Sequence, residues 1–494
     1  MRLSVKGDRI RRPFASMSKA IEEVYVSLKR IFKGSLLRPD DAEYPDARRI
    51  WNGLVAGRPG LIARCNDSRD VQAAVRAAGS ARVSTAVRCG GHSLAGFSTC
   101  DDGLVIDLSP MRKVEVDQEA RQARFEGGCR LGSIDAATQT VGLAFPAGVV
   151  SHTGAGGLVL GGGTGWLNRL HGLSCDNVRG FTVVVADGSL ALANMSENAD
   201  LYWALRGGGG NFGVVTEFEV TLHPVSSVLL GRGICPEDEV PGLVQHWRNL
   251  MPEAPDNLRW GFSLRTAPFE ENMPIEVRGH PIASVSALWV GDIDEGRRYV
   301  DQALAVSNHL AVSKEVLPFL TLQTMADSDF PHGRRYYTKA GYFKSLSDES
   351  IEIMMEALAS NPSVTNEIEL AYLGGAAARI APDETAFGDR SSPFVLNLLG
   401  NWSDPADDAA NISWIRNLFA RLRPATVPGV YVNFMSGDEG HRVPEAYRER
   451  WERLRAIKTI YDPSNFFRLN QNIPPMTAAA SGSPPSNPRN RRVR

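Results

Sequence analysis

The sequence predicts a mixed protein of helices and strands that packs as at least two units. The chain has 494 residues, more than one ordinary domain holds, and its 43% hydrophobic and 22% charged content is typical of a globular protein. Between residues 59 and 222, short strand-like runs repeatedly follow amphipathic helical patterns. After about Pro224 glycine becomes sparse and longer amphipathic helices appear, which indicates a second unit.

The first unit begins with a strand at residues 61–63, followed by a helix. Ser68 and Asp70 are typical helix caps, and the apolar residues that follow recur at helical spacing as far as Ala81. A strand at 83–87 comes next and ends in a glycine-rich turn. Further strands are expected at 104–108, 123–125, 181–186 and 214–222, with helices at 131–141 and 199–206.

The second unit alternates longer helices with strands. Amphipathic patterns predict helices at 240–250, 295–305 and 347–360. Strand-like runs occupy 283–290 and 392–399. No internal repeat is visible, and we interpret this unit as a second domain.

The two ends of the chain have distinct compositions. Residues 476–494 are rich in Pro, Ser, Ala and Arg, which predicts a disordered tail. Basic residues dominate the N-terminus, and apolar residues at helical spacing then predict an amphipathic helix: Met17, Ile21, Val24, Leu28 and Ile31. This helix either lies on a membrane surface or docks on the protein body, and we favour docking.

Composition also excludes several classes of protein. The formal net charge is −2, which does not suggest nucleic-acid binding, and no stretch is long and apolar enough for a membrane span. We therefore expect a cytoplasmic protein. The cysteines form no CxxC pair and no zinc-like spacing with histidine, so they are interpreted as reduced thiols and no metal site is expected: Cys65, Cys89, Cys100, Cys129, Cys175 and Cys235.

Glycine is concentrated in three clusters, at 90–96, 154–165 and 207–213. Glycine lets successive backbone N–H groups approach an anion such as a pyrophosphate. Tight turns that bind no ligand would explain any one of these clusters, but three clusters in one region favour a ligand site. Gly208, Gly210 and Gly213 match GxGxxG, but they follow a helix and precede a strand, the reverse of the Rossmann arrangement.

The first cluster, Arg88–Ser93 with Gly96, resembles the R-x-G-G-H-S-x-x-G signature of covalent flavoproteins with a PCMH-type FAD domain. The resemblance runs from about Leu37 to Pro475, and its closest group is the berberine-bridge-enzyme-like oxidases, including bacterial members of the 6-hydroxy-D-nicotine oxidase type. Its other motifs occur in order along the chain: 145–148, 154–165, 172–178, 183–188, 203–217, 431–434 and 461–474.

The resemblance implies an α+β fold. A two-part PCMH-type FAD-binding domain would be followed by a substrate domain with an antiparallel sheet and helices that covers the flavin. The implied organisation is an N-terminal extension with an amphipathic helix, the FAD domain, the substrate domain, a C-terminal segment that returns to the FAD domain, and the tail: 1–36, 37–225, 226–424, 425–475 and 476–494.

The resemblance also implies that His92 is bonded covalently to the 8α-methyl carbon of FAD. This chemistry needs a neutral imidazole nitrogen as nucleophile. The alternative is a histidine that only hydrogen-bonds within a turn. Some relatives add a second bond from a cysteine, and that position is Val150 here, so a single link is expected. Cys175 is interpreted as a small buried residue, and Cys89 replaces the usual small residue of the motif.

The remaining cofactor contacts are carried over from the family by position. One set of residues would surround the pyrophosphate and the nearby flavin, and a second set would line the opposite side. Val215 would lie near the adenine. Two asparagines of the closing segment would face the flavin. The residues are Arg88, Gly90, Gly91, Ser93 and Gly96; Gly148, Thr153, Gly154, Gly157 and Gly163; Val215; and Asn470 and Asn472.

Tyrosines are the first candidates for the catalytic group. Many relatives carry two in a Y-x-N-Y motif, of which this chain keeps Tyr431 but has Phe434 in place of the second. Tyr336 or Tyr337 can reach the flavin from the substrate domain, and ordinary packing is the alternative for each. Two further acid–base candidates are His152 and His441. Amine-oxidising relatives need no base.

The expected activity is that of an FAD-linked oxidase. A hydride would pass from a small alcohol, amine or sugar-like substrate to covalent FAD, and oxygen would take the electrons to give hydrogen peroxide. One alternative is a dehydrogenase that uses a quinone or protein acceptor. A more distant one is a flavin-binding protein without turnover.

Overall fold

Two amphipathic helices close the N-terminal side of the molecule in the computed structural model, which describes residues 18–271, 273–305 and 308–476. The apolar face of α1 (Lys19–Lys29) is buried against α3 (Ser68–Ala81), so the helix docks on the protein body. The cap of α3 differs from expectation. Asp67 is the N-cap and accepts the N–H groups of Arg69 and Asp70. Asp70 is instead buried and accepts backbone N–H groups from the preceding loop, including that of Gly34 at 2.9 Å.

The first sheet has four strands in the order β1-β2-β4-β3, and its last three strands are parallel. β1 pairs antiparallel with β2 and makes the outer edge. The carboxyl end of β3 leads directly into the first glycine cluster, so the sheet places that cluster at its edge. The strands are β1 (Ser35–Leu37), β2 (Leu61–Arg64), β3 (Thr85–Arg88) and β4 (Leu104–Asp107).

The second sheet is antiparallel, with five strands in the order β5-β6-β10-β8-β9. Three helices belong to the same part of the chain: α4 (Leu131–Gln139), α5 (Ala155–Leu160) and α7 (Ala199–Leu205). The second glycine cluster includes α5, and the third leads into β10. The strands are β5 (Val114–Asp117), β6 (Gln122–Glu126), β8 (Val178–Val184), β9 (Leu190–Asn194) and β10 (Val214–Thr221).

A short ladder of β7 (Leu143–Ala144) with β11 (His223–Pro224) precedes a seven-stranded sheet, and we propose a domain boundary here, near residue 225. The sheet is antiparallel throughout, in the order β15-β12-β14-β13-β17-β18-β16. Its strands are β12 (Ser227–Pro236), β13 (Leu258–Thr266), β14 (Pro281–Trp289), β15 (Ala311–Pro318), β16 (Arg335–Phe343), β17 (Glu367–Tyr372) and β18 (Phe394–Trp402).

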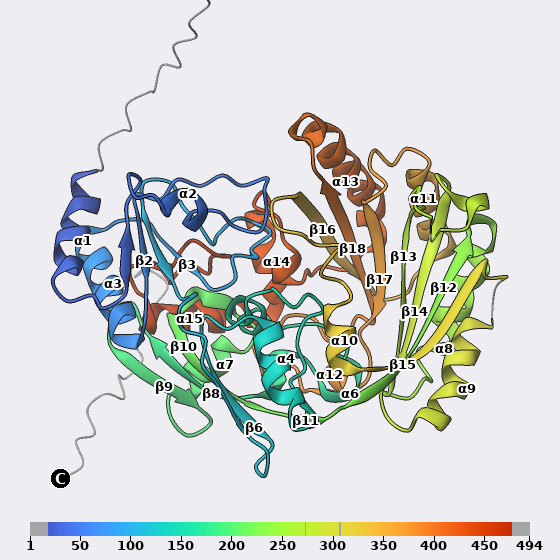
Figure 1. Ribbon diagram of the computed structural model, residues 1–494, viewed down its shortest axis with the longest axis horizontal. Coiled ribbons are helices and arrows are strands. Elements are labelled where there is room, and N and C mark those ends of the chain that lie inside the picture. The colour runs from blue at the N-terminus through green and yellow to red at the C-terminus, as the bar shows by residue number, and fades with distance from the viewer. Residues whose placement is uncertain (1–17, 272, 306–307, 477–494) are drawn as a thin grey trace, which may run out of the picture.

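Helices cover one face of this sheet, and the other face turns toward the first two sheets (Figure 1). Alternate residues of each strand point to opposite faces, which explains why apolar and polar residues alternate along these strands. Trp260, Leu370 and Leu398 pack under the helices, whereas their neighbours Arg259 and Glu369 lie on the opposite face of the sheet. The covering helices are α8 (Val240–Leu250), α9 (Ile293–Leu304), α11 (Asp348–Leu358) and α13 (Asp408–Leu422).

The final part of the chain returns to the first sheets through α14 (Val443–Tyr447) and α15 (Trp451–Tyr461). Lys458 of α15 is fully buried, and its ammonium group donates to the Asn211 carbonyl oxygen at 2.7 Å and to the Asp462 carboxylate at 2.6 Å. Asn211 in turn accepts the N–H of Ile473 at 2.9 Å. The closing segment is therefore tied to the third glycine cluster, and the architecture confirms the expected α+β class.

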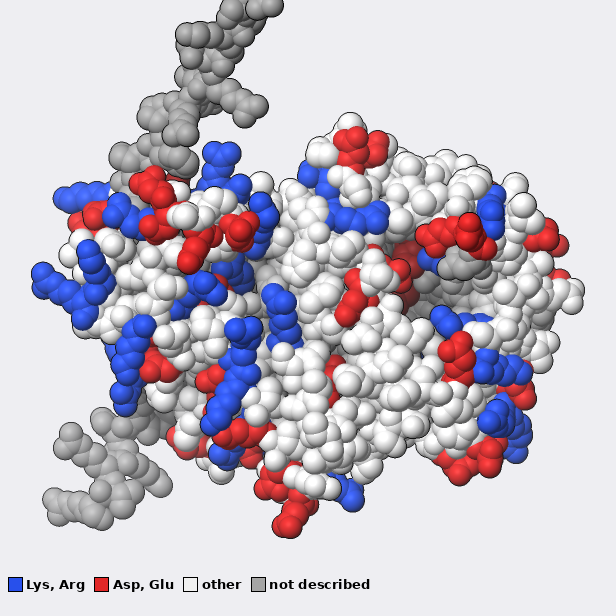
Figure 2. All heavy atoms as spheres, viewed as in Figure 1, with Lys and Arg blue, Asp and Glu red and all other residues white. Residues whose placement is uncertain are grey.

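Short helical segments fill several connections. They are α2 (Tyr44–Ala47), α6 (Asn168–His171), α10 (Phe319–Thr324) and α12 (Ala376–Arg379). Side chains of both charges are interspersed over the face in Figure 2, in keeping with the net charge of −2. Within the described ranges, no helix combines the length and apolarity that a membrane crossing requires. The basic N-terminus with Met17 and the tail after residue 476 lie outside the described residues.

Candidate FAD site

Two glycine loops touch each other beside the carboxyl end of β3. A Cβ atom on Gly90 would lie 2.3 Å from the backbone nitrogen of Gly154, and one on Gly154 would lie 2.2 Å from that of Gly90. Real Cβ atoms do not come so close to backbone, so both positions require glycine. This contact joins the first and second glycine clusters into one wall.

A cavity of about 450 Å³ lies between this wall and the seven-stranded sheet, on the face of that sheet that turns toward the first two sheets. That volume is in the range of ligand sites. All three glycine clusters reach it. The predicted cofactor residues that line it are Gly90, Gly91, His92, Ser93, Gly148, Thr153, Gly154, Gly157, Val215 and Asn470.

Four other predicted cofactor residues lie behind that lining. Arg88 is buried and donates to the Asp107 carboxylate at 2.6 Å, so its charge is compensated within the protein. Gly96 packs against Val55. Gly163 donates its N–H to the Tyr431 hydroxyl oxygen at 2.9 Å. Asn472 lies two residues after Asn470 in the closing segment, and its buried Oδ1 has no hydrogen-bond partner within the described ranges.

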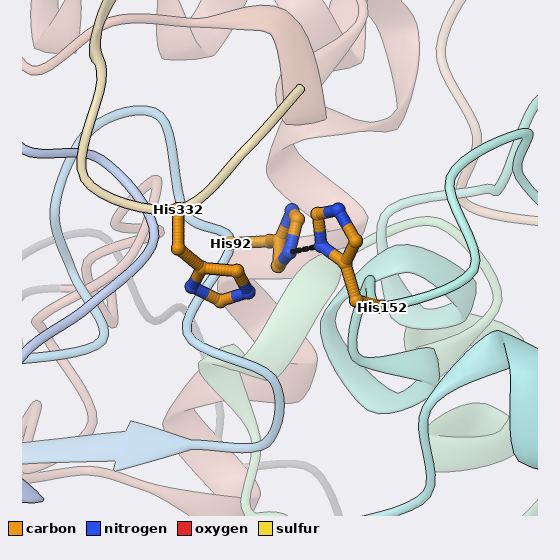
Figure 3. A group of neighbouring side chains, drawn as sticks. All are labelled: His92, His152 and His332. Carbon is orange, nitrogen blue, oxygen red and sulfur yellow. Dashed lines mark hydrogen bonds between the residues drawn. The ribbon is translucent and has the colours of Figure 1, made fainter. Parts of the chain in front are cut away.

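Two other histidines, His152 and His332, lie beside His92 (Figure 3). Trp51 stacks on its ring with 4.7 Å between centroids and 14° between planes. Its Nε2 lies 2.8 Å from Nδ1 of His152, and its Nδ1 lies 3.4 Å from Oγ1 of Thr153. Burial, together with the neighbouring His152 and His332, lowers the pKa of His92 well below its usual value. The ring is therefore neutral at neutral pH, as a nucleophile must be.

His332 completes a cluster of three histidines around this point (Figure 3). Its ring makes an edge contact with His92 at 5.5 Å and a tilted contact with His152 at 4.9 Å. One nitrogen from each ring lies within 4.8 Å of the other two, so the cluster offers three possible metal ligands. This cluster cannot be predicted from the sequence, because the three histidines come from loops far apart in the chain.

Tyr431 lies on the cavity wall with its hydroxyl oxygen in an accepting role. Besides the Gly163 N–H, the Asn433 amide donates to it at 2.8 Å. Burial raises the pKa of Tyr431 to about 12. Both contacts use the oxygen as acceptor, so the hydroxyl proton remains available for another acceptor. Phe434, where many relatives have tyrosine, packs against Tyr431 at 4.8 Å.

The other predicted acid–base residues are placed elsewhere. Tyr336 stacks on Trp51 at 3.7 Å and donates to the Pro331 carbonyl oxygen at 2.7 Å. Tyr337 donates to the Asp438 carboxylate at 2.7 Å. Both tyrosines lie outside the described cavity lining. His441 is exposed on the surface, whereas His152 contacts His92.

Polar side chains of the seven-stranded sheet form the opposite wall, and our sequence prediction did not include them. Glu369 lines the cavity and accepts from the Asn397 amide at 3.2 Å. Arg259 lies over the Trp166 ring at 4.6 Å, and burial lowers its pKa. Tyr342 and Tyr372 also line the cavity. The available signal was a polar residue at every second position of a strand.

Comparisons with known proteins agree with this geometry. The FAD binding domain family matches residues 59–193, and the family called berberine and berberine like matches residues 430–474. An uncharacterized FAD-linked oxidoreductase of Bacillus subtilis (strain 168) is 34% identical over 90% of this chain and 97% of its own length. This chain belongs to the berberine-bridge-enzyme-like family of FAD-linked oxidoreductases.

Other members of the family have assigned activities. The (R)-6-hydroxynicotine oxidase of Paenarthrobacter nicotinovorans is 32% identical over 90% of this chain and 97% of its own length. The crystal structure of 6-hydroxy-D-nicotine oxidase from Arthrobacter nicotinovorans has a TM-score of 0.80 and 28% identity, covering 90% of this chain and 98% of the other. A chitooligosaccharide oxidase shares the fold, with a TM-score of 0.81 at 21% identity over 92% of this chain and 100% of the other.

Three details of the cavity wall fit FAD. Among the described residues, Cβ atoms added to Gly157 or Gly210 would meet no atom within 4 Å beyond their chain neighbours and their own helix, so glycine there leaves room for a ligand. The buried Oδ1 of Asn470 has no hydrogen-bond partner among the described residues. An unpaired buried oxygen is costly unless a ligand donates to it.

Proposed function

We propose that this enzyme is an oxidase that holds FAD through a single covalent bond to His92 and oxidises a small alcohol, amine or sugar-like substrate. When bound, FAD would supply the two-electron acceptor for the substrate hydride and would pass the electrons to oxygen, giving hydrogen peroxide. The observation that carries the proposal is the cavity itself, with glycine loops and a neutral His92 on one wall and polar sheet residues on the other.

Polar side chains around the cavity support a substrate with hydroxyl or amino groups. Glu369 and Asn397 present a carboxylate and an amide oxygen, which accept hydrogen bonds, and Tyr431 has a hydroxyl proton to donate. Together they would orient the substrate against the flavin. With a pKa of about 12, Tyr431 keeps its proton at neutral pH and therefore acts as a hydrogen-bond donor.

A single covalent link agrees with the residues at the cavity wall. Val150, at the position where some relatives have a cysteine, lines the cavity. Cys175 is fully buried, and burial raises its pKa, so its thiol is a poor nucleophile. None of the six cysteines is joined to another by a disulfide.

Flavin absorbance tests the proposal. Purified enzyme is mixed without oxygen with alcohols, amines and sugars in turn, and then exposed to air. We expect one chemical class to bleach the flavin, and air to restore the absorbance rapidly with release of an equimolar amount of peroxide. Bleaching followed by slow reoxidation would instead indicate a dehydrogenase with another acceptor. A flavin that no compound bleaches would contradict turnover.

A further inference from the structure

His152 is the side chain that faces the anchoring histidine. It lies in the loop before α5, and its Nδ1 is 2.8 Å from Nε2 of His92 (Figure 3). Two neutral imidazoles at this distance share one proton, so one nitrogen donates and the other accepts. When His92 Nε2 carries that proton, its Nδ1 carries the lone pair, which faces the Thr153 hydroxyl at 3.4 Å.

The surroundings hold both rings in place. Stacking by Trp51 fixes the plane of His92. The Asp327 carboxylate accepts the Ser151 N–H at 2.8 Å and the Ser151 hydroxyl at 2.5 Å, which anchors the loop that carries His152. Burial lowers the pKa of His152, but Asp327 opposes that effect and favours the charged ring. His152 is therefore neutral and able to take a proton, and the neighbouring Asp327 would stabilise the protonated ring.

We propose that His152 positions the His92 ring and takes its Nε2 proton while His92 Nδ1 becomes bonded to FAD. The inference rests on the covalent link proposed above. A ring that forms a bond through Nδ1 becomes cationic unless Nε2 releases its proton, and His152 is the group in hydrogen-bond contact with that nitrogen.

The step balances with oxygen as the oxidant. One N–H bond of His92 and one C–H bond of the 8α-methyl group are lost, and one N–C bond forms. The two electrons and two protons leave with oxygen as hydrogen peroxide, after His152 has passed its proton to solvent. His152 is thus a positioning residue that acts through His92, and it is regenerated.

A bound divalent cation is the competing interpretation of the three-histidine cluster. Two nitrogens on one zinc ion lie about 3.3 Å apart, because zinc–nitrogen bonds are about 2.0 Å long and tetrahedral. The separation between His92 and His152 is 2.8 Å, which is a hydrogen-bond distance. The contacts of His332 with His92 and with His152 are ring contacts, so His332 serves as the matched control.

The experiment follows covalent attachment directly. The full chain and its H92A, H152A, H152N and H332A variants are produced in a riboflavin-starved host, FAD is added, and acid-stable flavin fluorescence is measured over time. We expect H152A and H152N to bind FAD but to attach it about 100-fold more slowly. Added imidazole should restore the rate of H152A, and H332A should remain within about twofold of the wild type.

Several outcomes overturn the inference. Attachment at the wild-type rate in H152A would do so, as would equal slowing in H152A and H332A. Loss of attachment in the wild type after treatment with a chelator would favour the metal interpretation. If the wild type attaches FAD and only H152A behaves unexpectedly, the inference alone fails. If the wild type never attaches FAD, the proposed link fails with it. Non-covalent FAD binding and melting curves verify that each variant is folded.

Discussion

At the scale of single residues, the site depends on how burial sets protonation. Burial keeps His92 neutral, as bond formation requires, and keeps Tyr431 protonated, with a pKa of about 12. The Tyr431 hydroxyl therefore stays protonated at pH 7. Our sequence prediction treated Tyr431 as a catalytic residue beside possible bases, and its environment favours a hydrogen-bond donor.

Replacing Tyr431 by phenylalanine tests that role. We expect kcat/KM to fall about 10-fold or more, because the substrate loses a donor. Stability should fall by about 1–3 kcal/mol, because the buried Gly163 N–H loses its acceptor. The wild-type pH profile should show no ionisation of Tyr431 between pH 6 and 10.

Tyr202 provides the control for this variant. Its buried hydroxyl donates to the Val178 carbonyl oxygen at 2.6 Å, outside the cavity lining. Y202F should lose stability and keep kcat/KM. Y431F with unchanged kcat/KM would remove Tyr431 from the site.

At the scale of elements, the loops and strands contribute in different ways. The glycine clusters were found from the sequence, because only glycine permits loops as close as those at Gly90 and Gly154. The strands were found approximately, because alternation marks them. Which side chains face the cavity depends on register and on long-range pairing, and so Glu369 and Arg259 were missed.

A substitution at Gly157 in α5 should affect flavin binding without affecting the stability of the fold. Beyond its own helix, a Cβ atom there would meet nothing among the described residues, so G157A should leave the stability of the flavin-free chain unchanged or raise it by up to about 1 kcal/mol. If FAD occupies the space, the same atom should lower its affinity about 10-fold. Flavin content and melting temperature measure the two effects.

Gly79 in α3 is the matched position, since a Cβ atom there also meets nothing. G79A should keep full flavin content. A G157A protein with normal flavin affinity would place the cofactor elsewhere.

Asp438 links β16 to the closing segment. Burial alone would raise its pKa, but hydrogen bonds from Tyr337, Lys339 and Arg416 outweigh burial and lower the pKa to about 2. A carboxyl with a lowered folded-state pKa stabilises the protein above its normal pKa of about 4, and this stability is lost as the pH falls toward about 2.

Replacing Asp438 by asparagine should therefore destabilise the protein at pH 7. We expect about 1 kcal/mol or less, because the side chain is 36% exposed and water screens it. The difference from wild type should shrink as the pH falls from about 4 to about 2 in urea titrations. D46N, at an 83% exposed side chain, should leave the free energy of unfolding at pH 7 within about 0.5 kcal/mol of the wild type. A D438N deficit that stays constant with pH would refute this assignment.

At the scale of the whole molecule, the sequence predicted the α+β class and the family, since glycine motifs and strand alternation are local signals. It did not predict the cluster of His92, His152 and His332, which only the packing of three loops creates. The docking of the closing segment on Asn211 is likewise a product of tertiary structure. The site is assembled by both parts of the chain, so neither part alone specifies it.

The proposed oxidase requires the bond between His92 and FAD, which peptide mass spectrometry can detect. Trypsin should release Cys89–Arg112, whose only histidine is His92. We predict that this peptide carries the mass of FAD less two hydrogen atoms and that fragmentation places the addition on His92. An unmodified peptide from protein that is yellow before denaturation would contradict the bond.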